Sequence, residues 1–194
     1  STMACLTETL GLMLPGGATP PSGSGDRLRQ AVASGRRAVA LAEEELRPSQ
    51  IVTAAALRNA LVVLAAVSGS TNAIVHLTAI ARRAGLTLEL DDLTQTSART
   101  PVLVDCKPAG AGWLEDLHRA GGLPPVLKEL APLLDGHTRG VSGLTLAEQL
   151  EQTPRAGDWQ TTIRPLGSPL APPGALVGLR GSLAPDGAVI KVAA

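Results

Sequence analysis

Small polar residues of the kind that bind anions occur together at Ser70-Thr71-Asn72. Such residues satisfy free N–H groups at the start of a helix, and a helix start preceded by a flexible glycine also suits an anion. His76 follows Asn72 by four residues, which places both side chains on one helix face. We therefore expect Ser70, Thr71, Asn72 and His76 to bind substrate. A capped helix start explains the same residues and is the favoured interpretation when the motif is taken alone.

The three histidines are not equivalent. His76 could hydrogen-bond a substrate oxygen or a neighbouring loop, and a packed histidine paired with backbone stays an open alternative. His118 precedes Arg119 near a helix end, where a cation favours the helix dipole, so a structural role is expected. His137 lies in a polar loop and is expected to be exposed.

The two cysteines, Cys5 and Cys106, are far apart in the sequence. They form neither a disulfide framework nor the clustered spacing of metal ligands. We interpret both as small buried hydrophobic residues. No residue of the chain is therefore assigned as catalytic or as a metal ligand.

Composition limits the possible partners and location. The chain has 194 residues, of which 44% are hydrophobic, so it can bury a core. It contains two Trp and no Phe or Tyr, so that core must be aliphatic. Seventeen basic residues balance seventeen acidic ones, and no basic run could follow a phosphate backbone, which argues against nucleic acid. No apolar run spans a bilayer and no secretory leader is visible, so a cytoplasmic location and no membrane partner are expected.

Apolar periodicity and Gly/Pro breaks predict mainly helices. Helices are expected at 1–14, 27–46, 53–67, 74–85, 114–120, from 124 or 125 to 134, and 145–150, with a short helix or turn beginning at 91–93. In helix 27–46 one side is apolar, and the charge cluster on the other side is expected to be the solvated face. Strands or extended segments are expected at 86–90, 101–106, 175–179 and 188–192, the last two flanking a turn at 185–187. Residues 68–72 then form the joint between two helices.

These elements predict an α/β fold with a division near the end of the chain. Residues 1–160 form a layered, helix-rich α/β domain, and the Pro/Gly-rich residues 161–174 form a linker. Residues 175–194 are expected to be the first strands of a truncated β-rich domain, because a two-stranded unit is not stable alone. The helix at the first residue likewise suggests that the chain was cut from a longer one.

Five stretches carry a resemblance to a known family: residues 1–8 (Ser-Thr-Met-Ala-Cys-Leu-Thr-Glu), 12–16, 69–77 (beginning Gly-Ser-Thr-Asn-Ala and ending His-Leu), 116–124 (beginning Asp-Leu-His-Arg-Ala-Gly-Gly) and 179–191. Together, and in this order, they resemble the family of dihydroxy-acid and sugar-acid dehydratases, which includes 6-phosphogluconate dehydratase. The family usually has Gly where this chain has Ser68, a replacement expected to tighten the turn.

The resemblance implies a dehydration that depends on an iron–sulfur cluster and Mg²⁺. A C–H proton is abstracted, a hydroxyl leaves with Lewis-acid help from the cluster, and the enol becomes a 2-keto acid. In this family the cluster cysteines lie before the segment that matches Ser1, the Mg²⁺ ligands also lie outside the matching segment, and the catalytic serine lies in the later β-rich domain. Cys5 and Cys106 match none of the cluster ligands. No cofactor is therefore expected on this chain alone.

Three functions remain in consideration. The first is the middle segment of a hydro-lyase that dehydrates 2,3-dihydroxy carboxylic acids in branched-chain amino-acid synthesis, which residues 115–118 and 183–191 resemble most. The second is a sugar-acid (aldonate) dehydratase with the same chemistry. The third is a non-catalytic scaffold fragment. The resemblance implies a small dihydroxy or sugar acid as partner and a homo-oligomer, either dimer or tetramer, and the chain alone is expected to be inactive.

Overall fold

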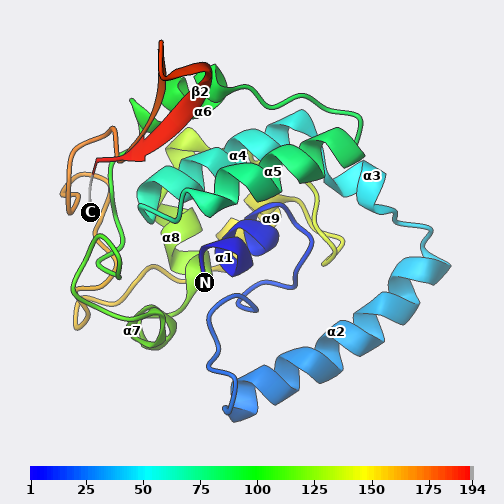
Figure 1. The fold of residues 1–194 in the computed structure, drawn as a ribbon. Helices are drawn as coiled ribbons and strands as arrows, with labels where there is room; N and C mark the ends of the chain where they lie inside the picture. The colour runs from blue at the N-terminus through cyan, green and yellow to red at the C-terminus, as the bar shows by residue number, and fades with distance from the viewer. Residues whose placement is uncertain (193–194) are drawn as a thin grey trace.

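The computed structural model describes residues 1–192 as a helical body with one projecting helix and one small sheet (Figure 1). The helices are α1 (Thr2–Thr9), α2 (Gly25–Glu43), α3 (Pro48–Ile51), α4 (Ala54–Ala66), α5 (Asn72–Arg83), α6 (Leu90–Ser97), α7 (Leu114–Arg119), α8 (Leu123–Glu129) and α9 (Leu146–Gln152), with a 3-10 turn at Ala131–Leu133. The strands are β1 (Leu176–Gly181) and β2 (Ala184–Lys191). The α/β class predicted from the sequence is confirmed.

Helix α4 lies at the centre of the core. Its residues from Leu61 to Ala66 are almost completely buried, and α1, α5 and α6 pack against it (Figure 1). Burying a leucine side chain such as Leu61 or Leu64 contributes roughly 1.5–3 kcal/mol, so this helix stabilises the whole domain. Its buried polar side chain, Asn59, donates to the Asp135 carbonyl at 3.0 Å and accepts from the Asp135 amide at 2.8 Å. The loop at Asp135 is thereby fixed to the core.

Several helices end earlier than the periodicity predicts. Helix α1 stops at Thr9 because Gly11 adopts the left-handed conformation, with φ of 82°, and its Cα lies against Gly140. A Cβ on Gly11 would lie 2.7 Å from the Gly140 Cα, so only glycine fits this crossing. The predicted helix ending at 134 likewise breaks into α8 and the 3-10 turn that contains Pro132.

Two predicted strands are not strands of a sheet. Residues 86–89 have no regular structure, and Leu90 already begins α6. Residues 101–106 are extended and largely buried, as expected, but among the described residues they make isolated bridges instead of a sheet: Val102 with Ala171, Val104 with Ile163 and Cys106 with Gly112. The Leu103 amide instead donates to the Ala66 carbonyl at 2.8 Å, at the end of α4. The segment therefore pairs with single residues rather than with a neighbouring strand.

Strands β1 and β2 form an antiparallel hairpin, and its turn differs from the prediction. Gly181 pairs with Ala184, so the turn lies at 182–183, and residues 185–187 belong to β2. The hairpin packs on α6: the Leu176 amide donates to Ser97 Oγ and the Gly178 amide to Thr94 Oγ1. The division into domains 1–160 and 175–194 stays a prediction, and its last two residues, 193–194, lie outside the described residues.

Helix α2 projects beside the body and contains no buried residue (Figure 1). Ser24 caps its start by accepting from the Arg27 amide at 3.2 Å. Both its charged side and its apolar side are open to solvent, with Leu28, Val32 and Val39 more than half exposed. The sequence predicted that the charged side of this helix faces solvent. The structure shows that the apolar side faces solvent as well. Within residues 1–192, no helix has the length and apolar character needed to cross a bilayer.

A buried carboxylate holds the loop that connects α1 with α2. Glu8 is 7% exposed, and its two oxygens accept from the Gly16 and Ala18 amides, each at 2.8 Å. Burial raises the pKa of Glu8 from its ordinary 4.5 to about 7, and the two amide donors oppose that rise less strongly. The folded chain therefore keeps a proton on Glu8 in a pH range where the unfolded chain has lost it.

This shift predicts a pH-dependent stability. The free energy of unfolding should fall as the pH rises from about 4.5 to about 7, because ionising Glu8 in the folded chain costs more than ionising it in the unfolded chain. Chemical denaturation across this range should show a flatter profile for Glu8→Gln than for the unchanged chain. Glu148→Gln is the control: Thr145 lowers the pKa of exposed Glu148, so its contribution changes only below about pH 4.5. Parallel profiles for the unchanged chain and Glu8→Gln would contradict the role of Glu8.

Candidate functional site

The joint between α4 and α5 is a tight turn that closes the end of α4. The Ser68 amide donates to the Ala65 carbonyl and the Gly69 amide to the Leu64 carbonyl, each at 2.9 Å, which is the pattern of a left-handed helix end. Ser68 occupies the left-handed position with φ of 40° and is completely buried. Glycine adopts this conformation without strain, whereas a serine Cβ is crowded in it. The expectation that Ser68 changes this turn therefore has a physical basis in its backbone conformation.

Two distant segments meet the joint. Thr2 Oγ1, in the first turn of α1, accepts from the Ser70 amide at 3.1 Å. Lys191, at the end of β2, donates from Nζ to the carbonyls of Ser68 and Gly69. A Cβ on Gly69 would lie 2.5 Å from Thr2 Cγ2, so glycine is needed where α1 crosses the joint. Three of the stretches that carried the resemblance, 1–8, 69–77 and 179–191, are thus brought together at one point.

The four predicted substrate-binding residues lie on the outer side of this joint. Ser70 Oγ accepts from the Asn72 amide at 3.2 Å, while Thr71 precedes the first turn of α5 without a side-chain capping bond. Asn72 and His76 are exposed on the same face of α5, as their spacing predicts. The backbone N–H groups of the first turn give this end of α5 a partial positive charge. The arrangement can attract a carboxylate, and the binding role of the four residues stays a prediction.

The Lys191 ammonium adds positive charge on the inner side of the joint. It is partly buried, and this burial lowers the pKa of Lys191. It donates to the Ser68 and Gly69 carbonyls of the turn just beyond α4, near a helix C-terminus where the helix dipole favours a cation. The joint therefore places a lysine behind the turn and a helix N-terminus in front of it.

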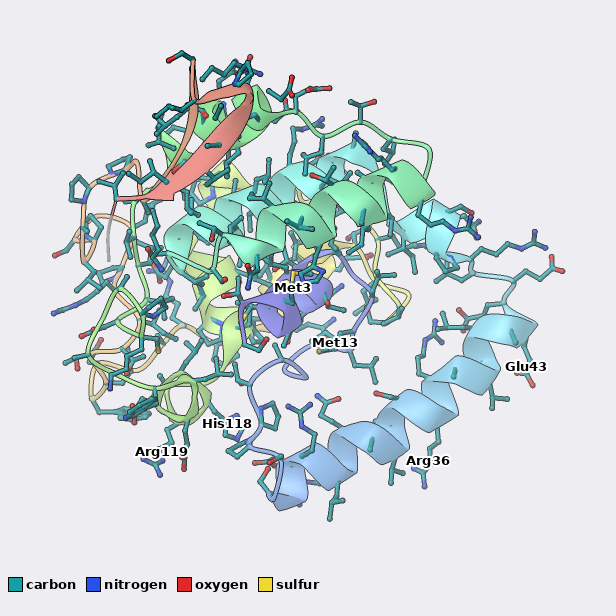
Figure 2. The ribbon with its side chains drawn as sticks, viewed as in Figure 1. Met3, Met13, Arg36, Glu43, His118 and Arg119 are labelled. Carbon is teal, nitrogen blue, oxygen red and sulfur yellow. The ribbon has the colours of Figure 1, made fainter. Side chains whose placement is uncertain are left out.

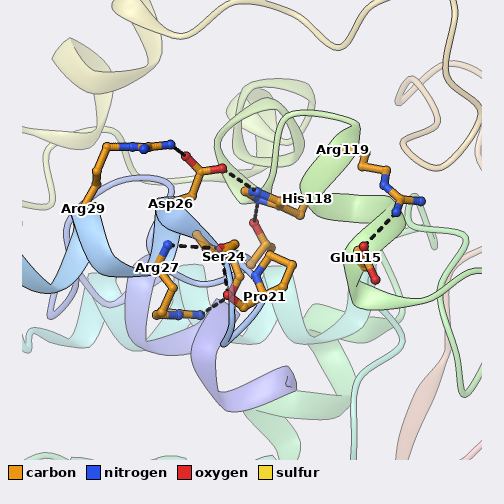
Figure 3. Close-up of polar contacts among 10 residues, drawn as sticks. Pro21, Ser24, Asp26, Arg27, Arg29, Glu115, His118 and Arg119 are labelled. Atoms are coloured by element: carbon orange, nitrogen blue, oxygen red, sulfur yellow. Dashed lines mark hydrogen bonds and ion pairs between the residues drawn. The ribbon is translucent and has the colours of Figure 1, made fainter.

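His118 forms a separate polar cluster at the base of α2 (Figure 3). Its Nε2 lies 3.2 Å from Asp26 Oδ2 and its Nδ1 lies 3.2 Å from Thr19 Oγ1. Arg29 first, and His118 after it, lower the pKa of Asp26. A cleft of about 660 Å³ opens beside these residues and Pro15. His118 thus links α7 to the α1–α2 loop and to α2, which agrees with a structural role, and His137 is exposed as predicted.

Cys5 and Cys106 do not have the chemistry of cluster ligands. Both thiols are free and buried, and this burial raises the pKa of each to about 11. Each free thiol is therefore protonated at neutral pH, and two cysteines are fewer than the set of thiolates that usually holds an iron–sulfur cluster. Cys106 Sγ donates to the Trp113 carbonyl at 3.1 Å. Within residues 1–192, no group of three or more His, Cys, Asp or Glu side chains is placed to hold a metal ion.

Sequence reasoning missed three residues that shape this region: Thr2, Glu8 and Lys191. All three lie in stretches that carried the resemblance, yet no local pattern marks them. Their partners are the joint or the α1–α2 loop, and two of the contacts span 68 and 123 residues. The one feature of the sequence that could have pointed to Thr2 and Lys191 is that both lie inside stretches that resemble the family.

Comparison with known proteins gives a consistent result. Residues 1–149 match the family model described as dihydroxy-acid/6-phosphogluconate dehydratase, N-terminal. The chain is 45% identical to the dihydroxy-acid dehydratase of Sulfurisphaera tokodaii, with 100% of this chain and 35% of that protein covered. It is 45% identical to the dihydroxy-acid dehydratase of Parvibaculum lavamentivorans, covering 100% and 34%. It is 42% identical to the chloroplastic dihydroxy-acid dehydratase of Arabidopsis thaliana, covering 99% and 32%.

The chain spans about a third of the length of these curated relatives. The alignments cover 99–100% of this chain, and more than three quarters of its residues fall within the family model. The chain belongs to the family of dihydroxy-acid and 6-phosphogluconate dehydratases.

Proposed function

We propose that this chain is a segment of a hydro-lyase that dehydrates 2,3-dihydroxy carboxylic acids to 2-keto acids, in branched-chain amino-acid synthesis. A base removes the proton on carbon 2, the hydroxyl on carbon 3 leaves, and the resulting enol rearranges to the keto acid with release of one water. The observation that carries the proposal is the meeting of three family stretches at the α4–α5 joint, through the contacts of Thr2 and Lys191.

The joint would bind the carboxylate that all substrates of this class share. The start of α5 offers backbone N–H groups, and the Ser70 and Thr71 hydroxyls lie at that start. Asn72 and His76 could then hydrogen-bond the hydroxyl groups of the acid from the same helix face. Exposure of both side chains leaves them accessible to a substrate and to the part of the protein that lies outside this chain.

The iron–sulfur cluster and Mg²⁺ would be held by residues outside this chain. Protonated, buried Cys5 and Cys106 do not suit a cluster, and residues 1–192 contain no group of side chains placed to hold a metal ion. This chain would therefore supply substrate positioning and structural support, while the cofactors supply Lewis-acid chemistry elsewhere in the full-length enzyme.

The proposal extends to location and assembly. A cytoplasmic homo-oligomer, dimer or tetramer, without nucleic-acid or membrane partners is proposed for the full-length protein. The relative from Arabidopsis thaliana is named chloroplastic and the one from Schizosaccharomyces pombe mitochondrial, so the location differs among family members.

A sugar-acid dehydratase is the second candidate. The family model is described by both a dihydroxy acid and 6-phosphogluconate, which supports the same chemistry on a longer polyol acid. The relatives described above, at 42–45% identity, are all named dihydroxy-acid dehydratases, which favours the first candidate. A non-catalytic scaffold fragment is the third.

Substrate choice can be measured on the full-length protein that contains this chain. The purified, anaerobically prepared enzyme should form 2-keto acid from a short branched 2,3-dihydroxy acid with a higher kcat/KM than from a six-carbon sugar acid. A preference for the sugar acid would favour the second candidate, and no keto acid from either substrate would favour the scaffold.

Substitutions at the joint separate substrate binding from helix capping. Ser70→Ala and Asn72→Ala in the full-length enzyme should lower kcat/KM by more than the roughly fivefold that a lost cap of about 1 kcal/mol could explain, with Tm little changed. His76→Ala should follow with a smaller loss. Thr53→Ala is the matched control, since Thr53 caps α4 by accepting from the Ala56 amide at 3.1 Å, away from the joint. Should the joint variants lose stability as Thr53→Ala does and keep full activity, the joint is only a helix cap.

The chain alone should bind no iron–sulfur cluster and should have no dehydratase activity. Two buried thiols with a raised pKa cannot supply the usual set of thiolates. Anaerobic reconstitution of the 194-residue chain with iron and sulfide, followed by absorption spectroscopy after desalting, tests this. A stoichiometric charge-transfer band that Cys5→Ser removes would show that the prediction is wrong.

A further inference from the structure

Helix α2 makes its contacts with the protein through several polar side chains, and it leaves an apolar stripe exposed to solvent. On the inner side, Gln30 donates to the Pro15 carbonyl at 3.1 Å, Arg37 donates to the Val141 carbonyl, and Asp26 contacts His118. Residues 26, 30, 33, 37, 40, 41 and 44 share this side at helical spacing, so it combines these polar contacts with Ala33, Ala40 and the half-buried Leu41. The opposite side consists of Leu28, Val32, Gly35, Val39 and Ala42, all of them exposed. An ordinary surface helix instead turns its apolar stripe toward the core.

The exposed apolar residues follow the spacing of a helix–helix seam. From Leu28 they recur at steps of four, three, four and three residues, which is the pattern that pairs two helices along their length. Leu28, Val32 and Val39 are 68%, 56% and 62% exposed. We call Leu28, Val32, Gly35, Val39 and Ala42 the α2 seam. A seam of this kind on a helix without any buried residue implies that another helix covers it.

We propose that the α2 seam is where a second copy of this chain docks, with the two α2 helices antiparallel about a two-fold axis near Arg37. This alignment places Val39 of each copy over Gly35 of the other, and Val32 over Ala42. Each large side chain then meets a small one, which allows the two helices to approach closely. A self-complementary pattern of this kind is what a two-fold interface requires.

Charges beside the seam select the same alignment. Arg29, Arg36 and Glu43 lie along one flank of it, and Arg36 and Glu43 point away from the body in Figure 2. In the antiparallel pair, Arg29 of each copy faces Glu43 of the other, so two opposite-charge pairs form, and the Arg36 residues meet near the axis. A parallel pair would instead set Gly35 against Gly35 and leave a hole there. It would also place Arg36 and Glu43 beside Ala31 and Ala38 of the other copy, where no opposite-charge pair forms. The charge pattern therefore favours a second copy in the antiparallel orientation.

This inference rests on the proposed homo-oligomer and not on the proposed reaction. The His118–Asp26 contact fixes α2 to the body near the start of the helix (Figure 3), and the Arg37–Val141 contact fixes it beyond its middle. The exposed seam residues lie on the opposite side of α2 from these contacts. The docking surface and the α4–α5 joint contain different residues. Loss of docking at the α2 seam can therefore be measured separately from loss of a function of the α4–α5 joint.

Sedimentation velocity of the full-length protein over a range of concentrations tests the proposal. Val39→Glu should raise the dimer Kd about a hundredfold, because a charge would enter the apolar layer over Gly35. Glu43→Arg should raise it about tenfold, because two attractive pairs become repulsive. The double change Arg29→Glu with Glu43→Arg reverses both charges and should restore most of the affinity. Glu151→Arg, the same change of charge on exposed α9, should have no effect.

Two outcomes would overturn the proposal. One is a full-length protein that is monomeric at all concentrations, in which case another part of the same chain covers the seam. The other is an oligomer whose Kd is unchanged by Val39→Glu and Glu43→Arg. Circular dichroism of each variant checks that the helices persist, and the rate of 2-keto acid formation is recorded in parallel. An inactive wild-type dimer that the seam variants dissociate would contradict the proposed reaction and support the docking surface.

Discussion

The burial of α4 is the constraint on which the rest of the structure depends. A helix that is apolar on nearly all sides cannot face water, so other elements must surround it. Helix α1 covers one side and α6 another, while the extended residues 101–106 end against the Ala66 carbonyl. Because the core has no Phe or Tyr, this covering is made by many small aliphatic contacts. The turn that follows α4 is consequently held in a fixed place.

Local patterns predicted the helices because each helix carries its own signals. Thr53 and Thr145 cap α4 and α9 as such residues do in isolated helices, and proline begins or ends several others. The extended segments were harder to predict, since Val102 and Val104 pair with single residues more than fifty positions later. No local signal distinguishes such isolated bridges from a strand of a sheet. The same limit applies to the hairpin turn, where Pro185-Asp186-Gly187 has turn composition but lies within β2.

The candidate site could be predicted only in part for the same physical reason. The residues of the joint itself were visible, because small polar side chains interrupt an apolar pattern. The residues that hold the joint in place are Thr2 and Lys191. Thr2 lies in the first turn of α1, and Lys191 is the last residue of β2. The apolar side of α2 shows a different limit: its residues recur at the spacing of a packed helix face, yet in the described chain they are exposed to solvent.

Because of the Lys191 contact, the α4–α5 joint cannot be completed until the end of the described chain has been synthesised. The Lys191 ammonium reaches carbonyls that lie more than 120 residues earlier, so α4 and α5 are synthesised long before their connecting turn receives this partner. Until the hairpin docks on α6, the Ser68 and Gly69 carbonyls of the turn lack their Lys191 donor. Completion of the joint is thus a late, long-range event in folding, which loop-closure entropy makes slow compared with forming either helix. Any shortened product that ends before β2 would contain both helices and an unfinished turn between them.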